Sequence, residues 1–136
     1  MHNKIDVFVH FVWGTSGRAK TMVGKIERTV KAAVATKCSE LRSPALAIGG
    51  TDDHMHLLVR LHPTVAVARL VGEVKGASSF AIAVVGDRCD FGWQAGYGAF
   101  SVSADDVRAV ESYVLNQRQH HAHNAILTEL ETTGEP

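Results

Sequence analysis

Apolar residues occupy every second position near the start of the chain. They are Ile5, Val7, Val9, Phe11 and Trp13. A period of two is typical of a β-strand that buries one of its faces. The alternation therefore predicts a first strand from Ile5 to Trp13.

The next segment changes to helical spacing. Its apolar residues are Ile26, Val30, Ala33, Val34 and Leu41, with Lys and Glu between them. Positions three and four apart share one face of a helix, so a first helix is expected here. It should end before Ser43-Pro44, because proline disfavours helical geometry in the residue before it.

Two short apolar segments follow, residues 45–48 and 54–61. Gly49-Gly50-Thr51-Asp52-Asp53 lies between them and has the composition of a hairpin loop. The two segments are therefore predicted to form antiparallel strands.

A second helix is predicted after Pro63-Thr64, with Thr64 as a plausible N-terminal cap and Gly86-Asp87 as the end. Its apolar face consists of Val67, Leu70, Val71, Val74, Ser78, Ala81, Ile82 and Val85. Residues 91–102 then mix glycine with aromatic residues, which suggests a loop that leads into a last strand.

A final helix is predicted to begin after Ser103-Ala104-Asp105-Asp106, which resembles a capping box. Val107, Val110 and Val114 give this helix an apolar stripe.

The order of predicted elements is β-α-β-β-α-β followed by one more helix. This order is typical of an α+β, ferredoxin-like βαββαβ sandwich, here with an added C-terminal helix. Two helices would cover one sheet face and leave the other open. We expect a single domain over residues 1–131 and a disordered tail over residues 132–136.

The composition is consistent with this fold and limits the classes of protein to which the chain could belong. The 136 residues are 46% hydrophobic, which is enough for one compact core. There is no run of about 18 apolar residues, and charged residues near the N-terminus do not suit a signal peptide, so no membrane association and a cytoplasmic location are expected. Cys38 and Cys89 lack C-x-x-C spacing and are interpreted as buried thiols.

The charges cancel overall but are unevenly distributed. Residues 1–60 carry nine Lys and Arg against five Asp and Glu, and residues 61–136 carry five against nine. A basic face in the first half would consist of Arg18, Lys20, Lys25, Arg28 and Lys31. The alternative is that these are ordinary solvated helix charges.

His54-Met55-His56 lies at the start of the third predicted strand. Alternation along a strand sends both imidazoles to one face and Met55 to the other. Since the apolar set must face the helices, His54 and His56 should point to the open face, where two imidazoles can bind one metal ion. A His-x-His pair alone is a weak signal, because two polar histidines on a half-exposed strand are common.

Tyr113 and Gln117 are four residues apart on the final helix and so share one side of it. They lie roughly 70° from the valine stripe at 100° per residue. We therefore expect them at the edge of the packed seam, within reach of both core and solvent. The alternative is a tyrosine at a packing boundary beside a solvated glutamine.

Four segments together resemble the single-tyrosine HUH transposases of the insertion sequence 200-like type, including the REP-associated relatives. The segments are Asp53-His54-Met55-His56-Leu57-Leu58-Val59, Lys75-Gly76-Ala77-Ser78-Ser79, Trp93-Gln94-Ala95-Gly96-Tyr97 and Tyr113-Val114-Leu115-Asn116-Gln117. They occur in the family's order and span nearly the whole chain.

The resemblance implies a role for each matching residue. His54 and His56 would bind Mg²⁺ or Mn²⁺, Gln117 would supply the third ligand, and Tyr113 would be the nucleophile. The implied reaction cuts and rejoins single-stranded DNA with hairpin ends through a 5′-phosphotyrosine. The implied assembly is a homodimer in which Tyr113 of one chain completes the histidine site of the other, or switches between the two.

Two other functions remain open at this stage. One is a domesticated enzyme that nicks single strands at chromosomal repeats. The other is a non-catalytic module that binds single-stranded nucleic acid, although such a module needs neither Tyr113 nor Gln117.

Further candidates have weaker signals. Tyr97 lies between glycines and is interpreted as a packing or base-stacking residue. His10 could approach the metal site from the first strand or have a structural role. His120, His121 and His123 form a cluster at a helix end, where they are interpreted as solvated or as interacting with the helix dipole. The residues considered for contacts with DNA are Arg18, Lys20, Lys75, Ser78 and Ser79, of which the last three could instead cover a polar helix edge.

Overall fold

The computed structural model describes residues 2–85 and 91–117. Within these ranges the chain forms four strands and three α-helices. The strands are β1 (Phe8–Gly14), β2 (Ala45–Gly50), β3 (His54–Arg60) and β4 (Gly98–Val102). The helices are α1 (Gly24–Glu40), α2 (Val67–Val84) and α3 (Val107–Leu115).

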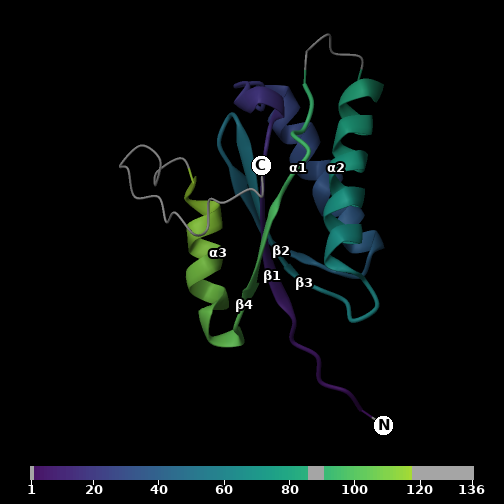
Figure 1. Ribbon diagram of the computed structural model, residues 1–136, viewed down its shortest axis with the longest axis vertical. Coiled ribbons are helices and arrows are strands. Elements are labelled where there is room, and N and C mark those ends of the chain that lie inside the picture. The colour runs from purple at the N-terminus through teal and green to yellow at the C-terminus, as the bar shows by residue number, and fades with distance from the viewer. Residues whose placement is uncertain (1, 86–90, 118–136) are drawn as a thin grey trace.

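The strands form one sheet in the order β2-β3-β1-β4, with every neighbouring pair antiparallel. Helices α1 and α2 cover one face of the sheet, and α3 lies on the opposite face (Figure 1). The ferredoxin-like βαββαβ arrangement with an added C-terminal helix is therefore confirmed.

The main hydrophobic core lies between the sheet and helices α1 and α2. Alternate residues of the central strands β1 and β3 form the sheet side of this core, and helix residues such as Val34 and Val74 pack against them. The strand residues are Val9, Phe11, Trp13, Met55, Leu57 and Val59. This is the apolar set that the sequence assigns to the helix side.

A second, smaller core lies on the other sheet face and seats α3. Ala47, Leu58 and Val114 are buried there, with Val107 and Val110 packed against them. Gly49 allows the close approach, because a Cβ atom at this position would overlap the carbonyl oxygen of Val114. This sheet face is therefore not open as expected: its own α3 covers it.

The first strand begins later than its alternation predicts. Pairing between β1 and β3 starts at Phe8 opposite Arg60, and the side chain of Val7 is 44% exposed. Beyond the end of β3 at Arg60, the Val7 carbonyl accepts the Leu61 N–H at 2.7 Å and the Ile5 carbonyl accepts from the Arg60 side chain, but no regular strand pairing continues over residues 5–7. The alternating pattern extends beyond the sheet that it helps to form.

The predicted helix starts are also displaced. Thr64 does not cap α2, which begins at Val67; instead, the Thr64 backbone N–H donates to His62 Nδ1. Before α3, residues 104–106 form a 3₁₀ turn, and the Ser103 hydroxyl bonds the Asp106 carboxylate at 3.0 Å rather than a helix N–H. In both places local side-chain bonds outcompete capping.

Several predictions fall outside the described residues. They concern the end of α2 at Gly86-Asp87, the thiol of Cys89, the cluster of His120, His121 and His123, and the tail over residues 132–136. Over the described ranges, none of the helices combines the length and apolar character that crossing a bilayer requires.

Candidate active site

His54 and His56 project from β3 onto the face that α3 covers. Met55 and Leu57 point the other way into the main core, as the strand alternation predicts. The two imidazole centroids are 5.1 Å apart, and the residues are 1% and 0% exposed. They therefore lie on the face that the alternation predicts and form a buried pair, unlike the half-exposed pair of the alternative interpretation.

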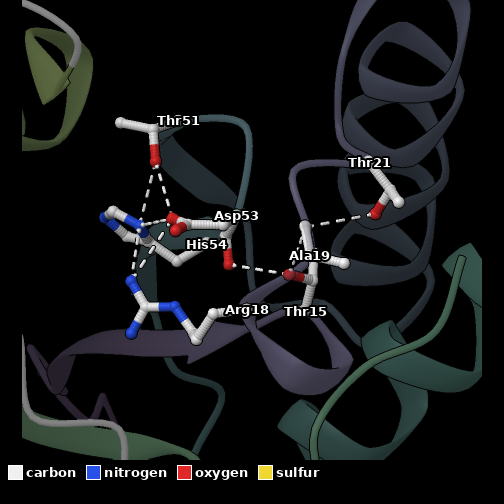
Figure 2. Close-up of polar contacts among 7 residues, drawn as sticks. All are labelled: Thr15, Arg18, Ala19, Thr21, Thr51, Asp53 and His54. Carbon is white, nitrogen blue, oxygen red and sulfur yellow. Dashed lines mark hydrogen bonds and ion pairs between the residues drawn. The ribbon is translucent and has the colours of Figure 1, made fainter.

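The Nδ1 atom of His54 lies in a cluster of polar groups at the start of β3 (Figure 2). Asp53 Oδ1 is 2.8 Å from this nitrogen and Thr51 Oγ1 is 2.9 Å from it. The Thr51 hydroxyl also donates to Asp53 Oδ1 at 3.2 Å. If His54 carries its proton on Nδ1, this N–H can be shared between Asp53 Oδ1 and Thr51 Oγ1 while the Thr51 hydroxyl donates to Asp53.

Arg18 adds a positive charge to this cluster. Its Nη2 atom is 3.3 Å from Asp53 Oδ1 and 3.4 Å from His54 Nδ1. Gly17 and Arg18 both adopt left-handed backbone conformations, with φ of 62° and 55°. The resulting turn directs the arginine side chain back over the end of β1 toward Asp53 (Figure 2).

Asp53 is held in its charged form by these neighbours. Burial by itself would raise the pKa of its carboxyl group, but the hydrogen bond with His54 and the charge of Arg18 lower the pKa below its ordinary value. A charged carboxylate beside an imidazole is a common way of fixing a metal-binding histidine.

The Nδ1 atom of His56 has a different partner. It is 2.8 Å from Nε2 of His10, which projects from β1 onto the same sheet face. The two rings are stacked, with centroids 5.0 Å apart and planes inclined by 21°. Both histidines thus have Nδ1 engaged within the protein, and Nε2 is the buried atom of each ring that a metal ion would bind.

Tyr113 lies against the histidine pair from α3. Its ring is 5.6 Å from that of His56, edge to face at 81°. Tyr113 is only 6% exposed and Gln117 only 1%. The expectation that both would reach solvent at the edge of the seam is wrong, because the close approach at Gly49 buries this side of α3 as well.

Gln117 lies one turn after Tyr113 and has a buried side-chain oxygen. Its Nε2 atom donates to the Tyr113 carbonyl at 2.8 Å. Its Oε1 atom is buried and accepts no hydrogen bond from the described residues. A buried carbonyl oxygen without a donor is costly, and a cation is one group that would satisfy it.

These donors fit a divalent ion held by two imidazoles and one amide oxygen. In the described part of the chain, no three His, Cys, Asp or Glu side chains are grouped to hold a metal. Among the described residues, Gln117 would offer its buried Oε1 atom as a further donor.

The residues considered for DNA contacts lie in different environments. Lys20 and Ser79 are exposed, and the Arg18 side chain is 49% exposed. Lys75 instead donates to the carbonyls of residues 94 and 96, and Ser78 is buried and accepts a bond from Trp93 Nε1. Lys75 and Ser78 thus fasten the loop before β4 to α2, which favours the structural alternative for both.

Tyr97 is placed away from the histidines. Its ring packs 6.5 Å from Phe11, on the sheet face that α1 and α2 cover. This geometry favours the packing interpretation.

Sequence reasoning missed Thr51 and Asp53 as partners of His54. Asp53 stands in the matched segment before His54 but was given no role there, and Thr51 was assigned only to the hairpin loop.

Comparison with known proteins decides the family. The sequence model described as transposase IS200-like matches residues 3–117. The chain belongs to the IS200-like transposases. A search of curated proteins found no match.

Two solved structures resemble this IS200-like transposase in fold. A transposase candidate from Deinococcus radiodurans R1 has a TM-score of 0.70 at 20% identity, over 91% of this chain and 94% of that one. A REP-associated tyrosine transposase bound to a REP hairpin has a TM-score of 0.68 at 14% identity, over 89% of this chain and 72% of that one.

Proposed function

We propose that this transposase cleaves and rejoins single-stranded DNA with Tyr113 as its nucleophile. The observation that carries the proposal is the burial of the Tyr113 ring 5.6 Å from His56, beside the His54–His56 pair. A tyrosine on a packing boundary has no need of two buried imidazoles. A module that only binds nucleic acid would not need this arrangement either.

We propose His54, His56 and Gln117 as the ligands of Mg²⁺ or Mn²⁺. Imidazole ligands suit Mn²⁺ better than Mg²⁺, although availability in the cell also decides which ion is bound. When bound, such an ion supplies charge neutralisation at a nonbridging phosphate oxygen. Asp53 and Thr51 keep the His54 ring oriented.

The covalent step uses the phenolic oxygen of Tyr113. This oxygen attacks the phosphorus, a bond from tyrosine to phosphorus forms, and the bond from phosphorus to the 3′-oxygen breaks. The phenolic proton is lost, and the leaving 3′-oxygen takes up a proton to become a hydroxyl. The 5′-phosphotyrosine keeps the phosphodiester energy, so another 3′-hydroxyl can reverse the step without ATP.

The proposed substrate is single-stranded DNA next to a hairpin. The resemblance to a REP-associated transposase bound to a REP hairpin supports this choice. Lys20, which follows β1, is an exposed cation available to phosphate groups, and the half-exposed Arg18 side chain would have to contact phosphate while paired with Asp53. We place the reaction in the cytoplasm, and we propose a homodimer as the working unit.

A second candidate function is nicking at chromosomal repeats rather than movement of an element. The observation that favours it is the same REP-associated neighbour. Both functions use the same chemistry at Tyr113, and they differ only in what happens to the cut ends. Strand joining to a second DNA in vitro separates them.

The proposal is tested by incubating the protein with end-labelled hairpin DNA and Mn²⁺ and resolving the products on a denaturing gel. A protein–DNA adduct is expected. His54→Ala and His56→Ala should abolish the adduct. Hairpin affinity should stay nearly unchanged, because contacts to the DNA phosphate backbone elsewhere on the protein supply most of the binding energy. Undiminished adduct in either variant would remove the histidines from the mechanism.

A further inference from the structure

His10 is a buried imidazole that the proposed chemistry does not use. It lies opposite Leu58 in β3 and Phe100 in β4, and it is fully shielded from solvent. Its ring is surrounded by the rings of His56, Phe100 and Tyr113, at centroid distances of 5.0, 6.1 and 6.3 Å. A polar side chain in such a place needs a reason beyond filling space.

The contact between His10 Nε2 and His56 Nδ1 has two hydrogen-bond assignments. At 2.8 Å one nitrogen must donate and the other accept. In the first assignment His56 Nδ1–H donates to the lone pair of His10 Nε2. In the second, His10 Nε2–H donates to His56 Nδ1.

Only the first assignment leaves His56 able to bind a metal ion through Nε2. A neutral imidazole carries one proton, so a proton on Nδ1 leaves the lone pair on Nε2. In the second assignment His56 carries its proton on Nε2, and its Nδ1 lone pair is used by His10. The identity of residue 10 thus bears directly on the tautomer of His56.

We propose that His10 is a positioning residue that accepts the Nδ1 proton of His56 and so holds the Nε2 lone pair of His56 toward the metal. The inference rests on the proposed function, in which His56 is a metal ligand. It makes the two ligands unequal: a charged carboxylate orients His54, and a neutral imidazole orients His56. The stacking of the two rings adds a fixed orientation to the fixed tautomer.

His10 is not a third ligand in this arrangement. Its Nε2 atom accepts the bond from His56, so ligation through that atom would break the contact that orients His56, and its Nδ1 atom then carries the ring's proton and has no lone pair for a metal. The positioning role is common around protein metal sites, where such partners change metal affinity by about 10–100-fold.

The tautomer is measured by NMR on the metal-free, full-length chain with labelled histidine at pH 8, where imidazoles are mostly neutral. In the wild type, His56 is expected in the Nδ1–H form. His10→Leu removes the acceptor at similar volume, and His56 should then populate the Nε2–H form. His10→Gln places an amide oxygen where Nε2 was and should restore the Nδ1–H form.

Metal affinity gives a second readout, taken from Mn²⁺ titration of the same proteins without DNA. His10→Leu should weaken Mn²⁺ binding by about 10–100-fold, and His10→Gln should recover most of it. His62→Leu is the matched control, because it removes an imidazole that bonds Thr64 and should leave Mn²⁺ affinity unchanged.

The wild-type spectrum alone can overturn the proposal, since an Nε2–H tautomer of His56 contradicts it without any variant. A folded His10→Leu protein with unchanged tautomer and unchanged Mn²⁺ affinity would also contradict it. Failure of the proposed function looks different: no DNA adduct forms, while the tautomer of His56 still follows residue 10.

Discussion

The carbonyl oxygen of Val114 in α3 lies directly over Gly49 in β2, in the space that a Cβ atom would occupy. Gly49 pairs with His56 across the β2–β3 ladder, and Val114 follows Tyr113 on the helix. A glycine in one strand therefore sets how closely the tyrosine-bearing helix approaches the histidine pair.

Gly49→Ala should displace α3 from the sheet and leave the main core folded. Overpacking at such a contact costs about 1–3 kcal/mol, and about 1.4 kcal/mol is a factor of ten in an equilibrium. Adduct formation on hairpin DNA should therefore fall about tenfold or more, whichever copy of the chain supplies the helix. Gly72→Ala is the control, because a Cβ atom there meets no atom within 4 Å. Equal rates for the two variants would show that the close contact is unimportant.

Asp53→Asn should weaken Mn²⁺ binding by about 10–100-fold while hairpin affinity stays the same. The amide removes the charge that holds the His54 proton on Nδ1, at a contact of 2.8 Å. Asp52→Asn removes the same charge one residue away and serves as control. Titration of both variants with Mn²⁺ makes the comparison, and equal affinities would assign Asp53 a role in the loop alone.

Cys38 should resist thiol reagents in the folded protein. Burial raises the pKa of its thiol to about 12, so at pH 8 roughly one molecule in ten thousand carries the thiolate. Because the pKa of the thiol is higher in the folded than in the unfolded protein, the folding free energy is at its full value below the unfolded pKa. The protein then loses stability as pH rises from that value toward 12. Labelling of a Cys89→Ser protein should be slow when native and fast in denaturant. Rapid native labelling at pH 8 would contradict the burial of this helix position.

Mixing His54→Ala protein with Tyr113→Phe protein tests whether sites are shared between copies. In the single chain described here Tyr113 lies on its own sheet, whereas the family resemblance suggests that α3 can also complete the partner's site. A mixed dimer would then regain one intact site, and adduct should return in the mixture. If subunit exchange is demonstrated and no adduct returns, each site is formed within one chain.

The sequence predicts the elements of this fold because periodicity reflects which face each element buries. The alternation through Phe11 and the spacing through Val34 correctly identified the sides of β1 and α1 that pack together. Alternation also placed His54 and His56 on the opposite face from Met55. Local patterns of this kind need no knowledge of distant residues.

Periodicity does not predict how deeply the site residues are buried. The burial of Tyr113 and Gln117 depends on the missing side chain of Gly49, more than sixty residues earlier in the chain. The bond between His10 and His56 joins residues 46 positions apart and depends on the register of β1 against β3. Such relationships follow from strand pairing, which the sequence pattern of either segment alone does not specify.

In the proposed reaction Tyr113 forms the covalent bond to DNA. The direct measurement is peptide mapping by mass spectrometry of the adduct after nuclease digestion, in wild type and in Tyr113→Phe. We expect a nucleotide joined through its 5′-phosphate to the peptide that contains Tyr113, and no adduct in Tyr113→Phe, whose fold and hairpin binding remain intact. A nucleotide joined to the peptide of Tyr97, or an adduct that persists in Tyr113→Phe, would contradict this assignment.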